Sequence, residues 1–77
     1  MQNNKTQSSL KPDEFDPAME HLREEKVQVS YEGRICVGHL WFAGINSLHG
    51  QYQVTLNRTP LWPVDPSTIK IYPSRTN

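Results

Sequence analysis

The sequence predicts an all-β domain of four to five short antiparallel strands, preceded by a disordered N-terminal arm and one short helix. Three observations lead to this prediction. The chain has only 77 residues, which allows a single domain. From Lys26 onward, apolar and polar residues alternate in short runs, as they do in half-buried strands. Glycine, proline, asparagine and serine separate these runs, as they do in the turns of small β-proteins.

The chain divides by composition into three predicted parts. Residues 1–15 are expected to be disordered, because they are mainly polar and cannot bury enough apolar surface to offset the entropy of ordering. Residues 16–25 are expected to form a short helix, and residues 26–77 the β-domain. Asp16 suits the N-cap of that helix, and Pro17 suits its first position, where an amide proton is not needed. The side chains expected to dock on the strands are Phe15, Met19 and Leu22.

The β-domain is expected to contain a tight hairpin turn, a bulge and a rigid connection. Its predicted strands span residues 26–31, 34–42, 51–56 and 67–72. Glu32-Gly33 suits a two-residue turn, and Gly38 is the predicted bulge. Both faces of the second strand are largely apolar, so this strand is expected to be central or sharply bent. Three prolines between residues 59 and 66 exclude a central strand there. Four short strands in roughly fifty residues favour a small SH3-like barrel.

Composition points to a cytoplasmic protein with a protein partner. Cys36 is the only cysteine, so no disulfide forms within the chain and a reducing compartment is expected. No segment is apolar enough to span a membrane, and residues 1–10 lack the apolar core of a signal peptide. The net charge is zero, whereas nucleic-acid binders usually carry a basic excess. Nucleic acid is therefore the less favoured partner, and the small size favours a homo-oligomer.

Neither catalytic nor metal-binding patterns stand out, and no cofactor is expected on the binding-module interpretation. Serine, histidine and aspartate occur in no nucleophile-elbow or triad context. The candidate metal ligands match no compact pattern of paired cysteines or histidines. Those ligands are His21, Cys36, His39 and His49.

The aromatic residues supply the candidate contact sites. We expect three of five to lie in the core; the five are Trp41, Phe42, Tyr52, Trp62 and Tyr72. Trp62 lies between two prolines and is the predicted exposed anchor, because a large aromatic on a stiff loop loses little entropy on binding. Its predicted companions in partner binding are His49, Arg58 and Leu61. Lys70, the only charge in the last predicted strand, also fits a solvated edge-strand lysine that blocks aggregation.

Four segments resemble the type II, plasmid-borne, trimethoprim-insensitive dihydrofolate reductases. They are Tyr31-Glu32-Gly33-Arg34-Ile35-Cys36-Val37-Gly38, Trp41-Phe42, Tyr52-Gln53-Val54 and Ile69-Lys70-Ile71-Tyr72-Pro73. The resemblance implies an SH3-like barrel that assembles as a tetramer around one pore, in which NADPH and dihydrofolate are held side by side. It implies that Lys70, Ile71 and Tyr72 line that pore, with Lys70 standing where the family has a glutamine. The family's first-strand lysine has no counterpart in Val29-Ser30-Tyr31.

Two functional predictions of different kinds follow, with a third behind them. The first is a small non-enzymatic binding module that acts through protein–protein contacts, like many small regulatory proteins of phages, plasmids and other mobile elements. The alternative is an oligomeric, NADPH-dependent protein of the dihydrofolate reductase type. The further alternative is a small barrel that binds nucleic acid.

Overall fold

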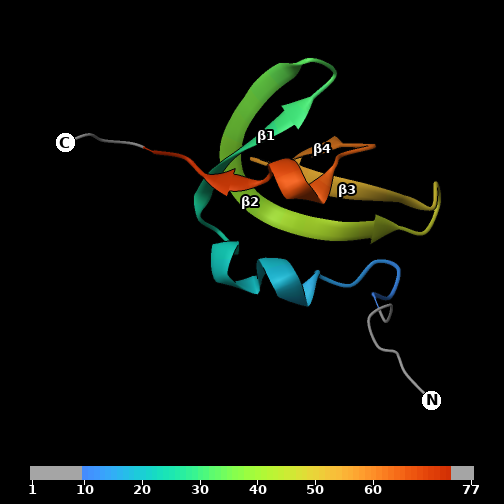
Figure 1. Ribbon diagram of the computed structural model, residues 1–77. Coiled ribbons are helices and arrows are strands. Elements are labelled where there is room, and N and C mark those ends of the chain that lie inside the picture. The colour runs from blue at the N-terminus through green and yellow to red at the C-terminus, as the bar shows by residue number, and fades with distance from the viewer. Residues whose placement is uncertain (1–9, 74–77) are drawn as a thin grey trace.

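The computed structural model describes residues 10–73, and its strands form one five-stranded antiparallel sheet, as the sequence predicts (Figure 1). The strand order is β4-β3-β2-β1-β5, in which the long β2 is shared by the two halves of the sheet. The strands are β1 (Lys26–Tyr31), β2 (Arg34–Asn46), β3 (Gln51–Leu56), β4 (Thr59–Leu61) and β5 (Lys70–Ile71). Within residues 10–73 there are also two 3₁₀ helices, η2 (Pro17–Leu22) and η3 (Pro66–Thr68).

The predicted hairpin turn between β1 and β2 is confirmed. Glu32 and Gly33 both have positive φ, at 52° and 80°, which is the conformation that a two-residue hairpin requires. Gly33 adopts it without steric cost because it has no Cβ.

The bulge that bends β2 lies at Trp41, and its prediction at Gly38 is wrong. Leu40 pairs with Leu56 and Phe42 pairs with Thr55, so Trp41 is the extra residue in β2. A bulge of this kind bends its strand and increases the local twist. The first half of β2 can therefore pair with β1 while the second half pairs with β3.

Gly38 serves close packing instead. A Cβ at this position would lie 2.8 Å from Asn57 Nδ2 and 3.0 Å from Leu56 Cβ. The missing side chain admits Asn57, which donates its backbone N–H to the His39 carbonyl at 3.0 Å. Asn57 Oδ1 also accepts a hydrogen bond from the His39 N–H at 2.9 Å. Gly38 thus lets the turn after β3 be bonded to the middle of β2.

The last strand differs from the prediction, whereas the proline-rich segment contains no central strand, as predicted. β4 lies within the proline-rich segment, and its place at one end of the strand order makes Pro60 tolerable. The predicted strand over residues 67–72 begins instead as η3. Asp65 caps that helix by accepting a hydrogen bond from the Ser67 N–H at 3.0 Å. This bond satisfies the Ser67 N–H within the helix, so that it needs no partner on a neighbouring strand. Only Lys70 and Ile71 remain in β5.

The core consists of nine buried aliphatic side chains and holds no aromatic one among the described residues. They are Leu22, Val27, Val29, Leu40, Ala43, Val54, Leu56, Val64 and Ile69. The expectation of three aromatic residues in the core is therefore wrong. Trp41 is exposed, and the other four aromatics are half-buried around the core. Aliphatic side chains from both halves of the sheet, such as Val29 of β1 and Val54 of β3, fill the interior together.

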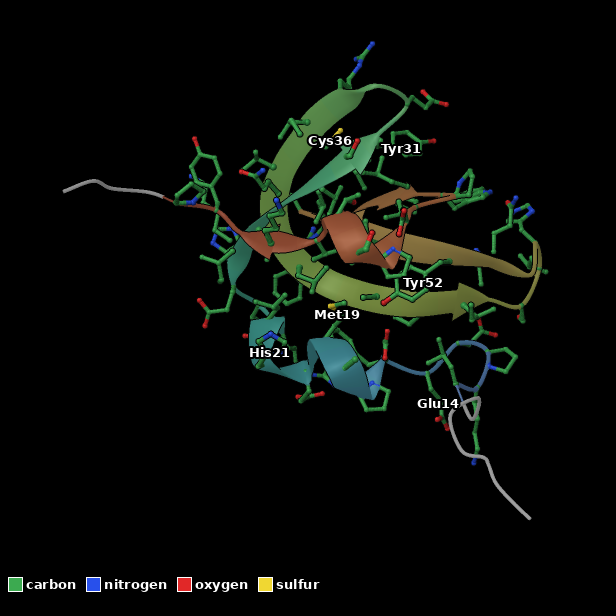
Figure 2. All side chains as sticks on the ribbon, viewed as in Figure 1. Glu14, Met19, His21, Tyr31, Cys36 and Tyr52 are labelled. Atoms are coloured by element: carbon green, nitrogen blue, oxygen red, sulfur yellow. The ribbon has the colours of Figure 1, made fainter. Side chains whose placement is uncertain are left out.

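The predicted helix is present but shorter, and it is a 3₁₀ helix. Asp16 is its N-cap, since Oδ1 accepts a hydrogen bond from the Ala18 N–H at 2.9 Å, and Pro17 begins it. Leu22 is buried, and Phe15 and Met19 pack against the core. Figure 2 shows Met19 on the side of η2 that faces the strands. The predicted docking of these three side chains is confirmed.

Residues 10–15 lie along β2, which corrects the predicted disorder up to residue 15; residues 1–9 lie outside the described residues. The Asp13 N–H donates to the Ile45 carbonyl at 2.7 Å, and the Asp16 N–H donates to the Ala43 carbonyl at 2.6 Å. Beyond the bulge, β1 no longer pairs with β2. The arm segment (residues 10–16) therefore satisfies carbonyl groups that the sheet leaves unpaired.

Two aspartates fix the arm segment through their side chains. Asp13 accepts hydrogen bonds from the Ser47 N–H, at 3.1 Å, and from the Ser47 hydroxyl. These bonds hold the pKa of the Asp13 carboxyl below its usual range, because they stabilise the ionised form. The Tyr52 hydroxyl donates to Asp16 Oδ2 at 2.6 Å. Burial, and then this bond to a carboxylate, raises the pKa of Tyr52 well above its usual value.

Replacing Gly44 by alanine should loosen the arm segment. The added Cβ would overlap the Glu14 carbonyl oxygen and lie 3.0 Å from Phe42 Cζ, so the arm must shift, at a cost of about 1–3 kcal/mol. Hydrogen exchange should show faster exchange of the Asp13 and Asp16 amides in Gly44→Ala. The Ile69 amide, which bonds to the Pro66 carbonyl at η3, is the internal control. Unchanged exchange at Asp13 and Asp16 would contradict the close approach.

Stability should fall in alkaline solution through Tyr52. Its pKa is raised in the folded protein, so its contribution is complete below the unfolded value of about 10 and is lost as the pH rises above it. The slope is at most about 1.4 kcal/mol per pH unit, reduced by solvent screening because the ring is half-exposed. Urea unfolding at pH 7 and near pH 11 should show a smaller alkaline loss for Tyr52→Phe. Equal losses in the two proteins would refute this role of Tyr52.

Candidate protein-binding surface

The outer face of β2 carries an apolar stripe, formed by Ile35, Val37 and Trp41 (the β2 stripe). Alternate residues of a strand point to the same face, so these three side chains lie opposite Leu40, which is fully buried. Their exposed fractions are 59% for Ile35, 37% for Val37 and 51% for Trp41. Isolated exposed apolar residues are ordinary. In this row Ile35 and Val37 are adjacent, and the exposed His39 lies between Val37 and Trp41.

Polar side chains border the β2 stripe across the sheet. Directly paired residues of antiparallel strands point to the same face, so the pairing register identifies the neighbours. Val37 pairs with Gln28, which pairs in turn with Lys70. Ile35 pairs with Ser30. The surface thus has an apolar line along β2 and a polar margin on β1 and β5.

The margin continues at the Trp41 end with a pair of stacked side chains. His39 pairs with Lys26, and Lys26 Nζ lies 4.9 Å from the centroid of the Tyr72 ring. The Tyr72 N–H donates to the Lys26 carbonyl at 2.9 Å. A lysine above an aromatic face is held there by the ring quadrupole. Tyr72 is therefore fixed at the margin of the surface.

The predicted pore residues lie together at the β5 edge. Lys70 is exposed and at the margin of the β2 stripe, and this placement suits a lysine that protects an edge strand. Ile71 is 50% exposed, but it pairs with the buried Val27 and so belongs to the opposite face of the strand. Tyr72 is half-buried beneath Lys26.

Of the predicted partner-binding residues, His49 and Leu61 lie beside Trp62, whereas Arg58 lies at the other end of β4. The His49 ring stacks on Trp62, with ring centroids 4.6 Å apart. The Trp62 carbonyl accepts a hydrogen bond from the Tyr31 hydroxyl at 3.1 Å. Trp62 is only half-buried by these contacts, and Leu61 packs against the core. Arg58 is exposed in the turn before β4, with φ at 75°. Trp41 is thus the more exposed tryptophan, contrary to the expectation for Trp62.

A shallow cavity of about 310 Å³ lies between the arm segment and the β2–β3 hairpin. Its lining residues are Asp13, Phe42, Asn46, Ser47, Leu48 and Gln53. The amides inside it bond to neighbours: Asn46 Nδ2 donates to Gln53 Oε1 at 2.5 Å, and Gln53 Nε2 donates to Thr55 Oγ1 at 3.0 Å. The polar groups that line the cavity are therefore already hydrogen-bonded, and those of Asp13 and Ser47 join the arm to the hairpin.

Within residues 10–73, no three side chains of His, Cys, Asp or Glu come together in a way that could hold a metal ion. No helix in that range is long and apolar enough to cross a membrane. The described carboxylates with lowered pKa values have structural partners. Asp65, for example, accepts hydrogen bonds from the Ser67 hydroxyl and amide, which stabilise its ionised form and lower its pKa.

Comparison with protein-family models, curated proteins and solved structures finds no match to this chain. The resemblance to type II dihydrofolate reductases therefore stays a prediction, carried by the four short segments quoted above.

Sequence analysis missed the β2 stripe as a site although its signal was present. The apolar residues on both faces predicted that this strand is central or sharply bent, and the structure confirms its central position. The structure buries only the face of Leu40 and leaves the face of Ile35, Val37 and Trp41 open. Alternation distinguishes two faces but does not say which of them meets the core.

Single-tryptophan variants should reveal this difference in exposure. Trp62→Phe leaves only Trp41, and Trp41→Phe leaves only Trp62. Because Trp41 is more exposed, its fluorescence should be quenched more strongly by acrylamide and should peak at a longer wavelength. Urea unfolding should abolish the difference, which controls for intrinsic effects of each site. Stronger quenching of Trp62 in the folded protein would show that the surface is assigned wrongly.

Proposed function

We propose that this chain is a non-enzymatic protein-binding module and that the β2 stripe is its contact surface. The observation that carries the proposal is the exposure of Trp41, Val37 and Ile35 in one row on a central strand. The centres of protein interfaces are enriched in aromatic and aliphatic residues and are bordered by polar ones. The β2 stripe, with its margin of Gln28 and Lys70, has this composition.

The stripe is also rigid, which favours binding. Leu40 and Ala43, on the inner face of β2, are fully buried in the core, and β1 is bonded to the half of β2 that carries Ile35 and Val37. A side chain that is already ordered loses little entropy when a partner covers it. Tryptophan is among the residues that most often dominate the binding energy of an interface. Trp41 is therefore the proposed anchor.

Charge favours protein over nucleic acid as the partner. The chain has a net charge of zero, and the margin of the stripe includes neutral Gln28 and Ser30 beside Lys26 and Lys70. Phosphate backbones are bound by clusters of lysine and arginine. Two lysines beside an apolar row are too few to form such a cluster. An apolar row instead suits the dehydrated centre of a protein interface.

Site-specific photocrosslinking tests the proposal. Benzoylphenylalanine in place of Trp41 should give discrete protein adducts in the cells that express the chain. The matched control carries the same group in place of Leu48, which is 87% exposed but lies outside the stripe. Adducts at position 41 and not at position 48 are the expected result. Absence of adducts at position 41, or the same adducts at both positions, would refute a specific contact surface there.

A further inference from the structure

We propose that the partner protein is held through an extended segment, which pairs with the backbone of Ile35 and Val37 (the open edge of β2) and adds a strand to the sheet. This inference rests on the proposed function and specifies how the partner is recognised. The recognised group is a main chain in β-conformation with an apolar side chain at every second position. The observation that carries it is the direction of the backbone groups of Ile35 and Val37.

The backbone groups of Ile35 and Val37 point to the side of β2 that lies opposite β1. His39 fixes this direction, because its N–H donates to Asn57 Oδ1 at 2.9 Å and its carbonyl accepts the Asn57 N–H at 3.0 Å. Asn57 directly follows β3, so both bonds lie on the β3 side of the strand. The backbone groups of successive residues alternate between the two sides of a strand. Ile35 and Val37 therefore share the direction of His39.

Bonds on the β1 side confirm this alternation. The Leu40 N–H donates to the Glu25 carbonyl, just before β1, at 3.0 Å. Ser30 of β1 is paired with Ile35, yet its N–H donates away from β2, to Thr68 Oγ1, at 3.2 Å. Directly opposite residues of an antiparallel pair either bond to each other or both point outward. Because Ser30 points outward, Ile35 does so as well.

The described part of the chain leaves the open edge of β2 without a partner strand. Within residues 10–73, β3 pairs with β2 only from Leu40 onward. Asn57 and Arg58 have positive φ, at 50° and 75°, and turn the chain into β4 at this point. The N–H and C=O groups of both Ile35 and Val37 thus face outward beyond the end of β3, and an extended main chain offers the complementary groups.

The other edges of the described sheet are protected, whereas this one is not. β4 has three residues and carries Pro60, which lacks an N–H. β5 has two residues and carries Lys70, and the second half of β2 is bonded to the arm segment. Shortness, proline, charge and covering segments are the usual means by which an edge avoids pairing with other chains. Ile35 and Val37 are instead uncharged and β-branched, which favours strand pairing.

An antiparallel segment fits this edge best. One partner residue opposite Ile35, and the next but one opposite Val37, can each exchange both of their backbone bonds with β2. Every outward group of the open edge is then satisfied. Directly opposite residues point to the same face of a sheet, so these two partner side chains would lie beside the β2 stripe. Apolar side chains at both positions would remove Ile35 and Val37 from water.

Hydrogen exchange of the full chain, with peptides selected from a displayed library of random sequences as probes, tests this inference. In the free protein the Ile35 and Val37 amides should exchange fast, whereas the Cys36 amide, which points to β1 between them, should exchange slowly. The selected peptides should carry apolar residues at alternate positions. A bound peptide should slow exchange at Ile35 and Val37 by about tenfold or more and leave Cys36 slow.

Two sets of variants separate strand addition from contact with side chains alone. Methylation of the peptide amides, one at a time, should weaken binding by about tenfold at every second position, because alternate amides point away from β2. Val37→Pro removes an outward N–H at a position where an edge tolerates proline, and it should weaken binding to a similar extent. Val37→Thr keeps the N–H and the β-branched shape and is the matched control. Far-UV circular dichroism checks that both proteins are folded, and the methylated peptides test the inference without any change to the chain.

Failure to select a peptide would overturn the inference, as would a bound peptide that leaves the Ile35 and Val37 amides fast or shows no alternation on methylation. Slow exchange of these two amides in the free protein would also overturn it, since another segment or a second copy would then occupy the edge. In each case, crosslinked adducts at position 41 would retain the proposed function. An absence of adducts would refute the proposed function, whatever the peptides do.

Discussion

The bend of β2 at Trp41 determines how the rest of this fold is arranged. One extra residue in the strand turns its second half away from β1 and toward β3. Leu40 and Ala43, on the two sides of the bulge, both remain buried, so the bend keeps one continuous core between the two halves. The same geometry turns Trp41 outward, since two residues of the bulge oppose one residue of β3. The core and the exposed surface thus depend on one local irregularity.

The bend also leaves backbone groups of β2 without a partner strand, and the N-terminal segment bonds to them. Where β1 ends, the carbonyl groups of β2 would be left without partners, and an unpaired edge invites association with other strands. The Leu40 N–H donates to Glu25, and the Ala43 and Ile45 carbonyls accept bonds from residues of the arm. The chain before β1 is therefore part of the sheet edge. It covers the edge of β2 while leaving the outer face of its first half open.

Local chemistry could be predicted from the sequence, and long-range contacts could not. The cap at Asp16, the turn at Glu32-Gly33 and the alternation of β1 each depend on neighbouring residues, and the structure contains all three. The position of the bulge depends on which residue of β3 faces Leu40, and no local pattern encodes that choice. The bond from Tyr52 to Asp16 joins residues 36 positions apart, and the backbone bonds of the arm have no side-chain signature.

The candidate surface was hidden from sequence analysis for the same reason. A strand with apolar residues on both faces is ordinarily buried on both, as in parallel sheets covered by helices. Here the residues that flank η2 bond to β2 at Leu40 and Ala43, whereas Ile35 and Val37 in the first half of the strand stay exposed. Exposure of isoleucine, valine and tryptophan to water does not stabilise the fold, and polar residues would be accommodated equally well on a solvated strand. An apolar row kept on a solvated, rigid strand is thus best explained by a partner that removes it from water.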